Sequence, residues 1–161
     1  MASVLHSSAS AVHLVAALGA LAAGTYVLLK PKGTRAHRWV GWGYVASMAV
    51  LLVTAFRIYF LFGRFGVVHW GAVGSATALL VGVGAAVLRP PGPAWLGWHY
   101  FSMSASVTGL YAAFAAESTY RFFALTYFWW ATLGPASAVL VVGGVLLCRR
   151  YPAWKAAFAP A

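Results

Sequence analysis

Four of the five histidines have the side-chain chemistry and the spacing to hold a haem or a metal ion. His13 and His69 each lie a few residues inside an apolar stretch, and His37 and His99 lie near the start of two other stretches. A polar side chain in a bilayer is costly, so an imidazole there is a functional candidate. Imidazole nitrogen also ligates haem iron, zinc and copper. These four histidines are therefore the first candidates for a site.

The depths of these histidines sort them into two pairs. If consecutive stretches run in opposite directions, His13 and His69 fall near the outer surface, and His37 and His99 near the inner surface. The first and third helices of a four-helix bundle face each other across its interior, as do the second and fourth. We therefore predict that His13 with His69, and His37 with His99, each ligate one haem b. The alternative is that single imidazoles only hydrogen-bond between helices. His6 in the N-terminal tail is expected to be solvated.

Glu117 is the single acidic residue of the chain and lies at the outer end of the fourth apolar stretch. Arg121 follows it by one helical turn. Arg57 falls inside the second stretch, where its charge needs a partner, a cavity or the interface. One interpretation is an ion pair of Glu117 with Arg57 or Arg121. The other is an outward-facing zinc or copper site of His13, His69 and Glu117, because two imidazoles and a carboxylate with an open position can hold such a metal.

A basic segment, residues 30–38, lies beside the inner histidine pair. Its Lys32, Arg35 and Arg38 could pair with haem propionates or attract an anionic electron donor, because basic side chains, guanidinium groups above all, bind carboxylates. The alternative is that these charges fix the topology and contact lipid headgroups.

Five apolar stretches of roughly 20 residues supply the elements that would position these side chains. A bilayer leaves no water for unpaired backbone groups, so the stretches are expected to be helices, and short connections make neighbours antiparallel. We predict an all-α integral membrane bundle, a four-helix core plus one, as a single transmembrane domain over 1–161. The first stretch is expected to be a retained helix rather than a signal peptide, because no Lys or Arg precedes it. The expected spans are about 9–29, 39–62, 67–88, 97–118 and 126–148.

The distribution of Lys and Arg predicts the orientation. Cytoplasmic loops carry an excess of positive charge. We therefore predict that the N-terminus is outside and the C-terminus inside. The inner side then receives Lys30, Lys32, Arg35, Arg38, Arg89, Arg149, Arg150 and Lys155, and the outer side keeps Arg64 and Arg121.

The composition excludes several classes of function. One Asp or Glu against eleven Lys and Arg leaves no carboxylate pair for glycosidase-like or two-metal chemistry. The single Cys148 excludes an internal disulfide framework and a Cys-rich zinc or iron–sulfur site. The basic residues lie between apolar runs rather than on one face, so a nucleic-acid partner is not expected. No motif identifies a catalytic residue.

Two resemblances add to these patterns. The first rests on Pro31-Lys32-Gly33-Thr34, His37-Arg38, Gly41, His69, His99-Tyr100, Met103, Gly109-Leu110-Tyr111, Glu117 and Arg121. With these residues the chain resembles, over about residues 13–123, a family of uncharacterised bacterial integral membrane proteins of unknown function. This resemblance implies the membrane fold, in the cytoplasmic (inner) membrane of a bacterium, without a reaction. A looser similarity is to the transmembrane di-haem cytochromes b of the ascorbate-dependent oxidoreductase type, in which one histidine per helix of a four-helix core ligates haem.

These patterns favour a transmembrane oxidoreductase that binds two b-type haems and passes electrons between the membrane faces. Its expected partners are the lipid bilayer and a small-molecule or protein electron donor and acceptor. Two other hypotheses stay open. One is a membrane metal-binding protein with the outer zinc or copper site, and the other is a non-catalytic subunit or small transporter.

Overall fold

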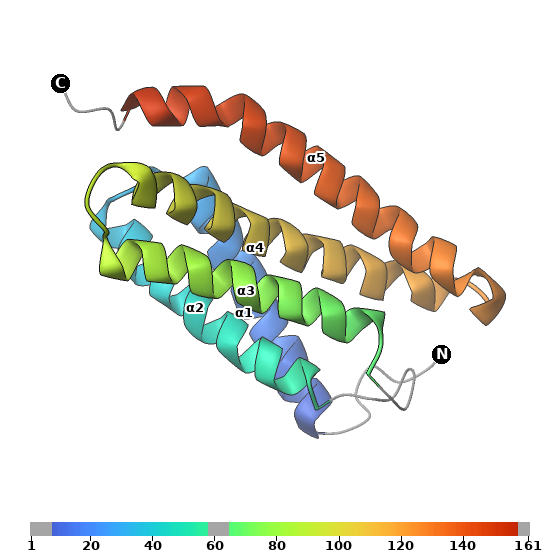
Figure 1. Ribbon diagram of the computed structural model, residues 1–161. Helices are drawn as coiled ribbons and strands as arrows, with labels where there is room; N and C mark the ends of the chain where they lie inside the picture. Colours follow the sequence, from blue (N-terminus) through green and yellow to red (C-terminus); the bar gives the residue numbers. More distant parts are fainter. Residues whose placement is uncertain (1–7, 58–64, 158–161) are drawn as a thin grey trace. The chain divides into compact units, whose positions relative to one another are not determined.

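A computed structural model describes residues 8–57 and 65–157 of the chain. The chain divides into two compact units, Met1–Ala76 (unit 1) and Thr77–Ala161 (unit 2), and the boundary falls inside α3. The described residues form five α-helices and two short 3-10 helices (Figure 1). They are α1 (Ser8–Leu29), α2 (Arg35–Ala55), α3 (Val67–Leu88), α4 (Ala94–Thr119), η1 (Tyr120–Phe122), η2 (Leu125–Tyr127) and α5 (Phe128–Ala157).

The predicted all-helical class is confirmed, and the first and third helices begin and end within one residue of their expected bounds. α2 differs. It begins earlier than expected because the Thr34 hydroxyl caps it, accepting the amide hydrogen of His37 at 3.0 Å. It ends at Ala55, and the expected extension to residue 62 falls partly on residues 58–62, which lie outside the described residues. α5 runs past the expected end at 148, with Pro135 and Pro152 inside the helix.

Among the described residues, four helical segments are long and apolar enough to cross a membrane: Ser8–Leu29, Arg35–Ala55, Val67–Leu88 and Leu125–Ala156. At most 22% of the residues in their apolar windows are buried, so large apolar side chains such as Leu80 and Leu140 stay exposed. A soluble protein rarely leaves apolar surface of this extent uncovered. The chain is therefore a membrane protein of the helical type.

α4 is not one of these four segments, although we expected a span over 97–118. Its polar side chains lower its hydropathy, and two of them, Ser104 and Ser106, are buried. In unit 2, α4 lies between the second half of α3 and α5 (Figure 1). A helix covered by its neighbours needs less apolar surface than a helix that faces lipid on most sides.

In unit 1, α1 and α2 pack side by side and run antiparallel. Gly19 on α1 approaches Ser47 on α2, and a Cβ atom at Gly19 would lie 3.2 Å from the Ser47 hydroxyl oxygen. Ala20, Tyr44 and Met48 are almost completely buried in this unit. Small residues let membrane helices approach closely. The same packing of α1 against α2 brings His13, near the start of α1, to Thr54, near the end of α2.

In unit 2, glycines set both helix contacts of α4. A Cβ atom at Gly82 of α3 would lie 2.7 Å from the Met103 sulfur and 3.0 Å from the Met103 backbone nitrogen. A Cβ atom at Gly143 of α5 would lie 3.0 Å from the Thr108 hydroxyl oxygen and closer still to the Thr108 methyl group. The absence of side chains at these two glycines therefore allows α3 and α5 to lie against α4.

Candidate functional site

The imidazole of His13 is oriented by a hydrogen bond between α1 and α2. Its Nδ1 lies 2.8 Å from the hydroxyl oxygen of Thr54. The Thr54 hydroxyl lies 2.9 Å from the carbonyl oxygens of both Val50 and Leu51 on its own helix, so its single proton points to that helix. The Thr54 oxygen must then accept, and His13 Nδ1 must donate. In the neutral imidazole this leaves the lone pair on Nε2.

The imidazole of His99 has the same tautomer for a simpler reason. Its Nδ1 lies 2.8 Å from the backbone carbonyl oxygen of Gly82 on α3, and a carbonyl oxygen can only accept. His99 therefore donates its Nδ1 hydrogen, and the lone pair is on Nε2. A histidine that ligates a metal typically donates its other ring nitrogen to a carbonyl, carboxylate or water in this way. His13 and His99 thus both fit the role of a ligand.

His69 has the opposite tautomer. Its Nδ1 accepts the backbone amide hydrogen of Gly66 at 3.1 Å, and its own amide donates to the Gly66 carbonyl at 3.0 Å. This is one half of a capping box at the start of α3: the imidazole takes the place of the usual carboxylate or amide, and the Gly66 carbonyl oxygen accepts where an N-cap side chain would. Because Nδ1 accepts, the proton of the neutral ring is on Nε2. His69 is 2% exposed and stacks on Phe65, with 4.8 Å between ring centroids.

His37 lies in the first turn of α2, in unit 1, and is half-buried. His37 and His99 were expected to form the inner pair; His37 belongs to unit 1 and His99 to unit 2. The outer pair, His13 and His69, belongs to unit 1, where His13 contacts α2 and His69 caps α3.

Lys32, expected to contact an anion, caps α1. Its ammonium group donates to the carbonyl oxygens of Val27, Leu28 and Lys30 at 2.6, 2.7 and 3.0 Å. Three bonds account for the three protons of an ammonium group, and they satisfy carbonyls that the end of a helix leaves unpaired. Arg35 and Arg38 are exposed, as is Lys30, so these side chains of the segment can meet an anion.

Glu117 forms the ion pair with Arg121 that was one of the two expected pairings. The Tyr120 hydroxyl also donates to the Glu117 carboxylate at 3.3 Å. Burial raises the pKa of Tyr120, and the adjacent Glu117 charge raises it further. Arg57, expected deep inside the second span, lies two residues beyond the end of α2 and is exposed. A charge at a helix end stays solvated, which removes the cost that the expected position would carry.

No group of three or more His, Cys, Asp or Glu side chains that could hold a metal ion occurs among residues 8–57 and 65–157. In unit 2 the Glu117 carboxylate is engaged by Arg121 and Tyr120. The zinc or copper site of His13, His69 and Glu117 therefore gains no support from the described side chains.

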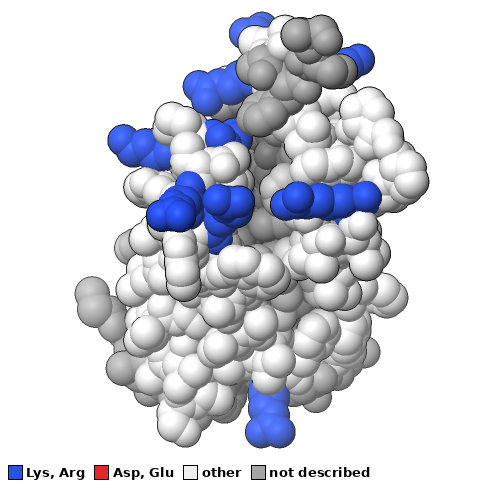
Figure 2. All heavy atoms as spheres, turned by 90° about the vertical axis from the view of Figure 1, so that its left-hand side faces the viewer, with Lys and Arg blue, Asp and Glu red and all other residues white. Residues whose placement is uncertain are grey.

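Each unit has a basic end. In unit 1, Lys30, Lys32, Arg35 and Arg38 lie where α1 ends and α2 begins. In unit 2, α5 runs antiparallel to α4, as the contact of Gly143 with Thr108 and the bond from the Tyr100 hydroxyl to the Leu147 carbonyl require. The end that holds the start of α4 therefore also holds Arg89, Arg149, Arg150 and Lys155. Figure 2 shows Lys and Arg side chains on a face where no acidic side chain is visible.

Two groups that orient the histidines were not singled out from the sequence. Thr54 is 41 residues from His13, and Gly82 contributes only its backbone carbonyl. A threonine in a helix commonly bonds a carbonyl of its own helix, and Thr54 does so. Its second role depends on which face of α2 meets α1, and the sequence carries no signal for that.

Comparison with protein-family models, with curated proteins and with solved structures gives no match.

Proposed function

We propose that the chain is a bacterial inner-membrane protein that ligates b-type haem through its histidines and passes electrons between the two membrane faces. The observation that carries this proposal is the tautomer shared by His13 and His99. In each, a group on a neighbouring helix accepts the Nδ1 hydrogen and the lone pair is on Nε2. An imidazole held in this way is oriented as a ligand before any cofactor binds.

The depths of these two histidines support one site toward each surface. His13 is 17 residues from Lys30 along α1, or roughly 25 Å, so it lies far from the basic end of unit 1. His99 is in the second turn of α4, near the basic end of unit 2. If positive charge marks the cytoplasmic side, His13 is near the outer surface and His99 near the inner surface. The N-terminus is then outside and the C-terminus inside.

A bound haem would supply reversible one-electron chemistry, and the chain would supply its ligands and its surroundings. Thr54 and the Gly82 carbonyl fix the rings of His13 and His99. The exposed Arg35 and Arg38, at the basic end of unit 1, would pair with the propionate carboxylates of haem.

The second ligand at each haem is assigned from the sequence pattern, His69 for His13 and His37 for His99. His69 would have to release the Gly66 amide and move its proton from Nε2 to Nδ1 before Nε2 could ligate. The net cost of one such hydrogen bond is about 1 kcal/mol. That is small beside a metal–imidazole bond, so the cap at the start of α3 weakens ligation by His69 without preventing it.

The same two hydrogen bonds support a second candidate function, a membrane subunit whose histidines only join helices. His13–Thr54 connects α1 to α2, and His99–Gly82 connects α4 to α3. Interhelical hydrogen bonds of this kind stabilise membrane bundles by roughly 0.6–2 kcal/mol each. The two candidates differ in whether Nε2 binds iron.

Absorption spectra of the purified full chain and its histidine variants test the proposal. Expressed with added haem precursor, the protein is expected to show a Soret band and, when reduced, α-band absorption. His13→Ala and His99→Ala should each remove part of the signal, and His6→Ala, the matched control from the N-terminal tail, should not. A coloured protein whose spectrum survives both substitutions would contradict the assigned ligands. A colourless protein that both substitutions destabilise would favour the helix-joining subunit.

A further inference from the structure

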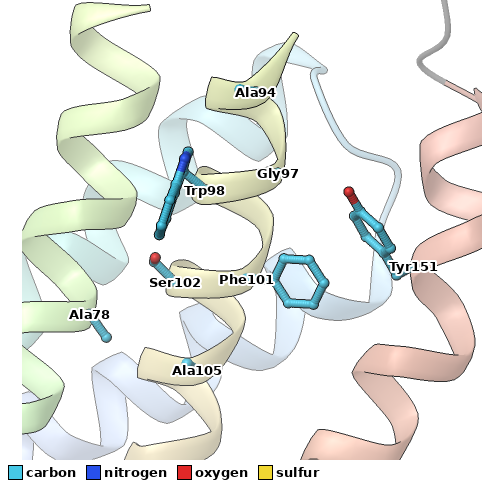
Figure 3. Close-up of a pocket in the computed structure, with 8 residues that line it drawn as sticks. All are labelled: Ala78, Ala94, Gly97, Trp98, Phe101, Ser102, Ala105 and Tyr151. Carbon is cyan, nitrogen blue, oxygen red and sulfur yellow. The ribbon is translucent and has the colours of Figure 1, made fainter.

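Unit 2 has an open apolar pocket of about 570 Å³ along α4, a volume typical of ligand sites. Ala78 of α3 and Tyr151 of α5 contribute to it, and the other lining residues are on α4. Figure 3 shows Trp98 and Ser102 on the side of α4 toward α3, and Phe101 on the side toward Tyr151. The complete lining is Ala78, Ala94, Gly97, Trp98, Phe101, Ser102, Ala105 and Tyr151.

The pocket has few polar groups, and they lie among apolar side chains. The Ser102 hydroxyl points toward the Trp98 ring, and the Tyr151 hydroxyl points toward Gly97, where a Cβ atom would lie 3.5 Å from it (Figure 3). Alanine and aromatic side chains form the remaining walls. Such a surface suits a flexible hydrocarbon chain better than a polar solute, because a polar solute would lose its hydration without gaining hydrogen bonds.

The start of the pocket coincides with the basic end of unit 2. Tyr100 lies beside the pocket on α4 and packs against Tyr151 and Trp154, with ring centroids 5.6 and 4.5 Å apart. Arg150 is close enough to Tyr100 to interact with it electrostatically. Arg89 lies over the Trp95 ring, with its guanidinium carbon 5.5 Å from the ring centroid.

The first turn of α4 adds to this positive end. Pro93 at the N-cap makes no side-chain hydrogen bond to the helix, so no side chain at that position caps the first amides. The start of a helix attracts anions through those amides and the helix dipole. Within unit 2 the described carboxylate, Glu117, is at the other end of α4 and is paired with Arg121. The pocket lining is therefore free of charged side chains, and positive charge lies at the end of unit 2 where the pocket begins.

We propose that this pocket binds one anionic glycerophospholipid, with an acyl chain along Trp98, Phe101 and Ala105 and the phosphate at the start of α4. Arg149 and Arg150, at the basic end of unit 2, supply positive charge for the phosphate. A zwitterionic lipid with the same acyl chains would fit the apolar body but would gain less from the charges. The site needs both parts, so an anion without an acyl chain does not occupy it.

Native mass spectrometry of the detergent-purified full chain tests this site. Phosphatidylglycerol and phosphatidylcholine with identical acyl chains are the two probes. The protein is expected to retain one phosphatidylglycerol in preference to phosphatidylcholine. Each Lys or Arg near a membrane surface strengthens anionic lipid binding roughly fivefold, so the pair of substitutions Arg149→Gln and Arg150→Gln should weaken phosphatidylglycerol retention roughly 25-fold. Arg35→Gln with Arg38→Gln, which removes two charges from unit 1, is the matched control and should have little effect.

The apolar body of the pocket is tested separately. Ala105→Phe should displace the lipid without changing charge, whereas Ala113→Phe, an exposed position on α4 outside the pocket lining, should not. Ala78→Leu on α3 is the second variant, for use if Ala105→Phe does not fold. Equal retention of the two lipids by the unaltered protein would overturn the proposal. Equal losses of phosphatidylglycerol in the two double-arginine variants would also overturn it. So would displacement of the lipid by inorganic phosphate, if the Ala105→Phe protein also retains the lipid unchanged.

Discussion

The position of a proton on an imidazole ring decides what that ring can bind. Thr54 receives the Nδ1 hydrogen of His13, and the Gly66 amide donates to Nδ1 of His69. The first arrangement leaves a lone pair on Nε2, and the second leaves a proton there. Two histidines that look equivalent in the sequence therefore differ in how readily they ligate iron.

The Thr54 bond gives a prediction for a single side chain. Thr54→Val keeps the shape of the side chain but removes the acceptor for His13, so ring orientation and tautomer are no longer fixed. Loss of such a supporting contact typically costs about 10–100-fold in affinity, and we expect that loss at the outer haem site. Haem titration followed in the Soret region measures it.

Thr25→Val is the matched control, because Thr25 also donates to a carbonyl of its own helix, Leu21, at 2.6 Å. It should leave haem affinity unchanged. If Thr54→Val binds haem as tightly as the unaltered chain does, Thr54 does not position a ligand.

At the residue scale, the sequence predicts which side chains are candidates but not their hydrogen bonds. The four histidines and the Glu117–Arg121 pair could be selected because each is a polar group in an apolar chain. The role of Lys32 could not be predicted, because a basic residue after a helix suits a cap, a lipid contact and an anion site equally well. Its three hydrogen bonds to backbone carbonyls show that Lys32 caps α1.

At the scale of elements, apolar length predicts the existence of helices better than their ends. α1 and α3 follow the apolar pattern closely, whereas α2 ends at Ala55, short of the expected end at 62. Apolar residues continue after Ala55, so composition has no signal for that end. At α4 the expected helix is present, but its hydropathy is too low for a candidate membrane span. The reason is that this helix, packed between α3 and α5 in unit 2, carries polar side chains.

Adjacent glycines in α5 give a prediction for helix packing. Gly143→Ala should destabilise unit 2 by about 1–3 kcal/mol, because its Cβ would overlap the stiff, β-branched Thr108. Gly144→Ala has nothing within 4 Å and should be neutral, or more stable by up to about 1 kcal/mol through helix propensity. Unfolding of each variant in mixed micelles, followed by circular dichroism, measures the difference.

Adding Thr108→Ala to Gly143→Ala removes the methyl and hydroxyl groups that the new side chain would meet and should recover much of the lost stability. Similar unfolding free energies for Gly143→Ala and Gly144→Ala would show that the α4–α5 contact is not close at this point.

At the scale of the whole molecule, charge is the feature that relates the chain to a membrane. Both units have a basic end, and the inner set of eight Lys and Arg residues predicted from the sequence includes Arg89 and the α5 residues Arg149 and Arg150. Positive charge near helix ends is retained on the cytoplasmic side during insertion. The order of helices and loops can be read from the sequence, so the orientation can be predicted without the structure.

Reporter fusions at the C-terminus test the orientation. A C-terminal alkaline phosphatase should be inactive in bacterial cells and a C-terminal green fluorescent protein should fluoresce, because we propose that this terminus lies in the cytoplasm. An active phosphatase with a dark fluorescent protein would reverse the orientation and would exchange the outer and inner positions of His13 and His99.

The haem content of the purified full-length chain tests the central claim most directly. A pyridine haemochrome assay after expression with added haem precursor is predicted to find two haem b groups per chain. A chain that is helical and folded but contains no haem under these conditions would contradict the account.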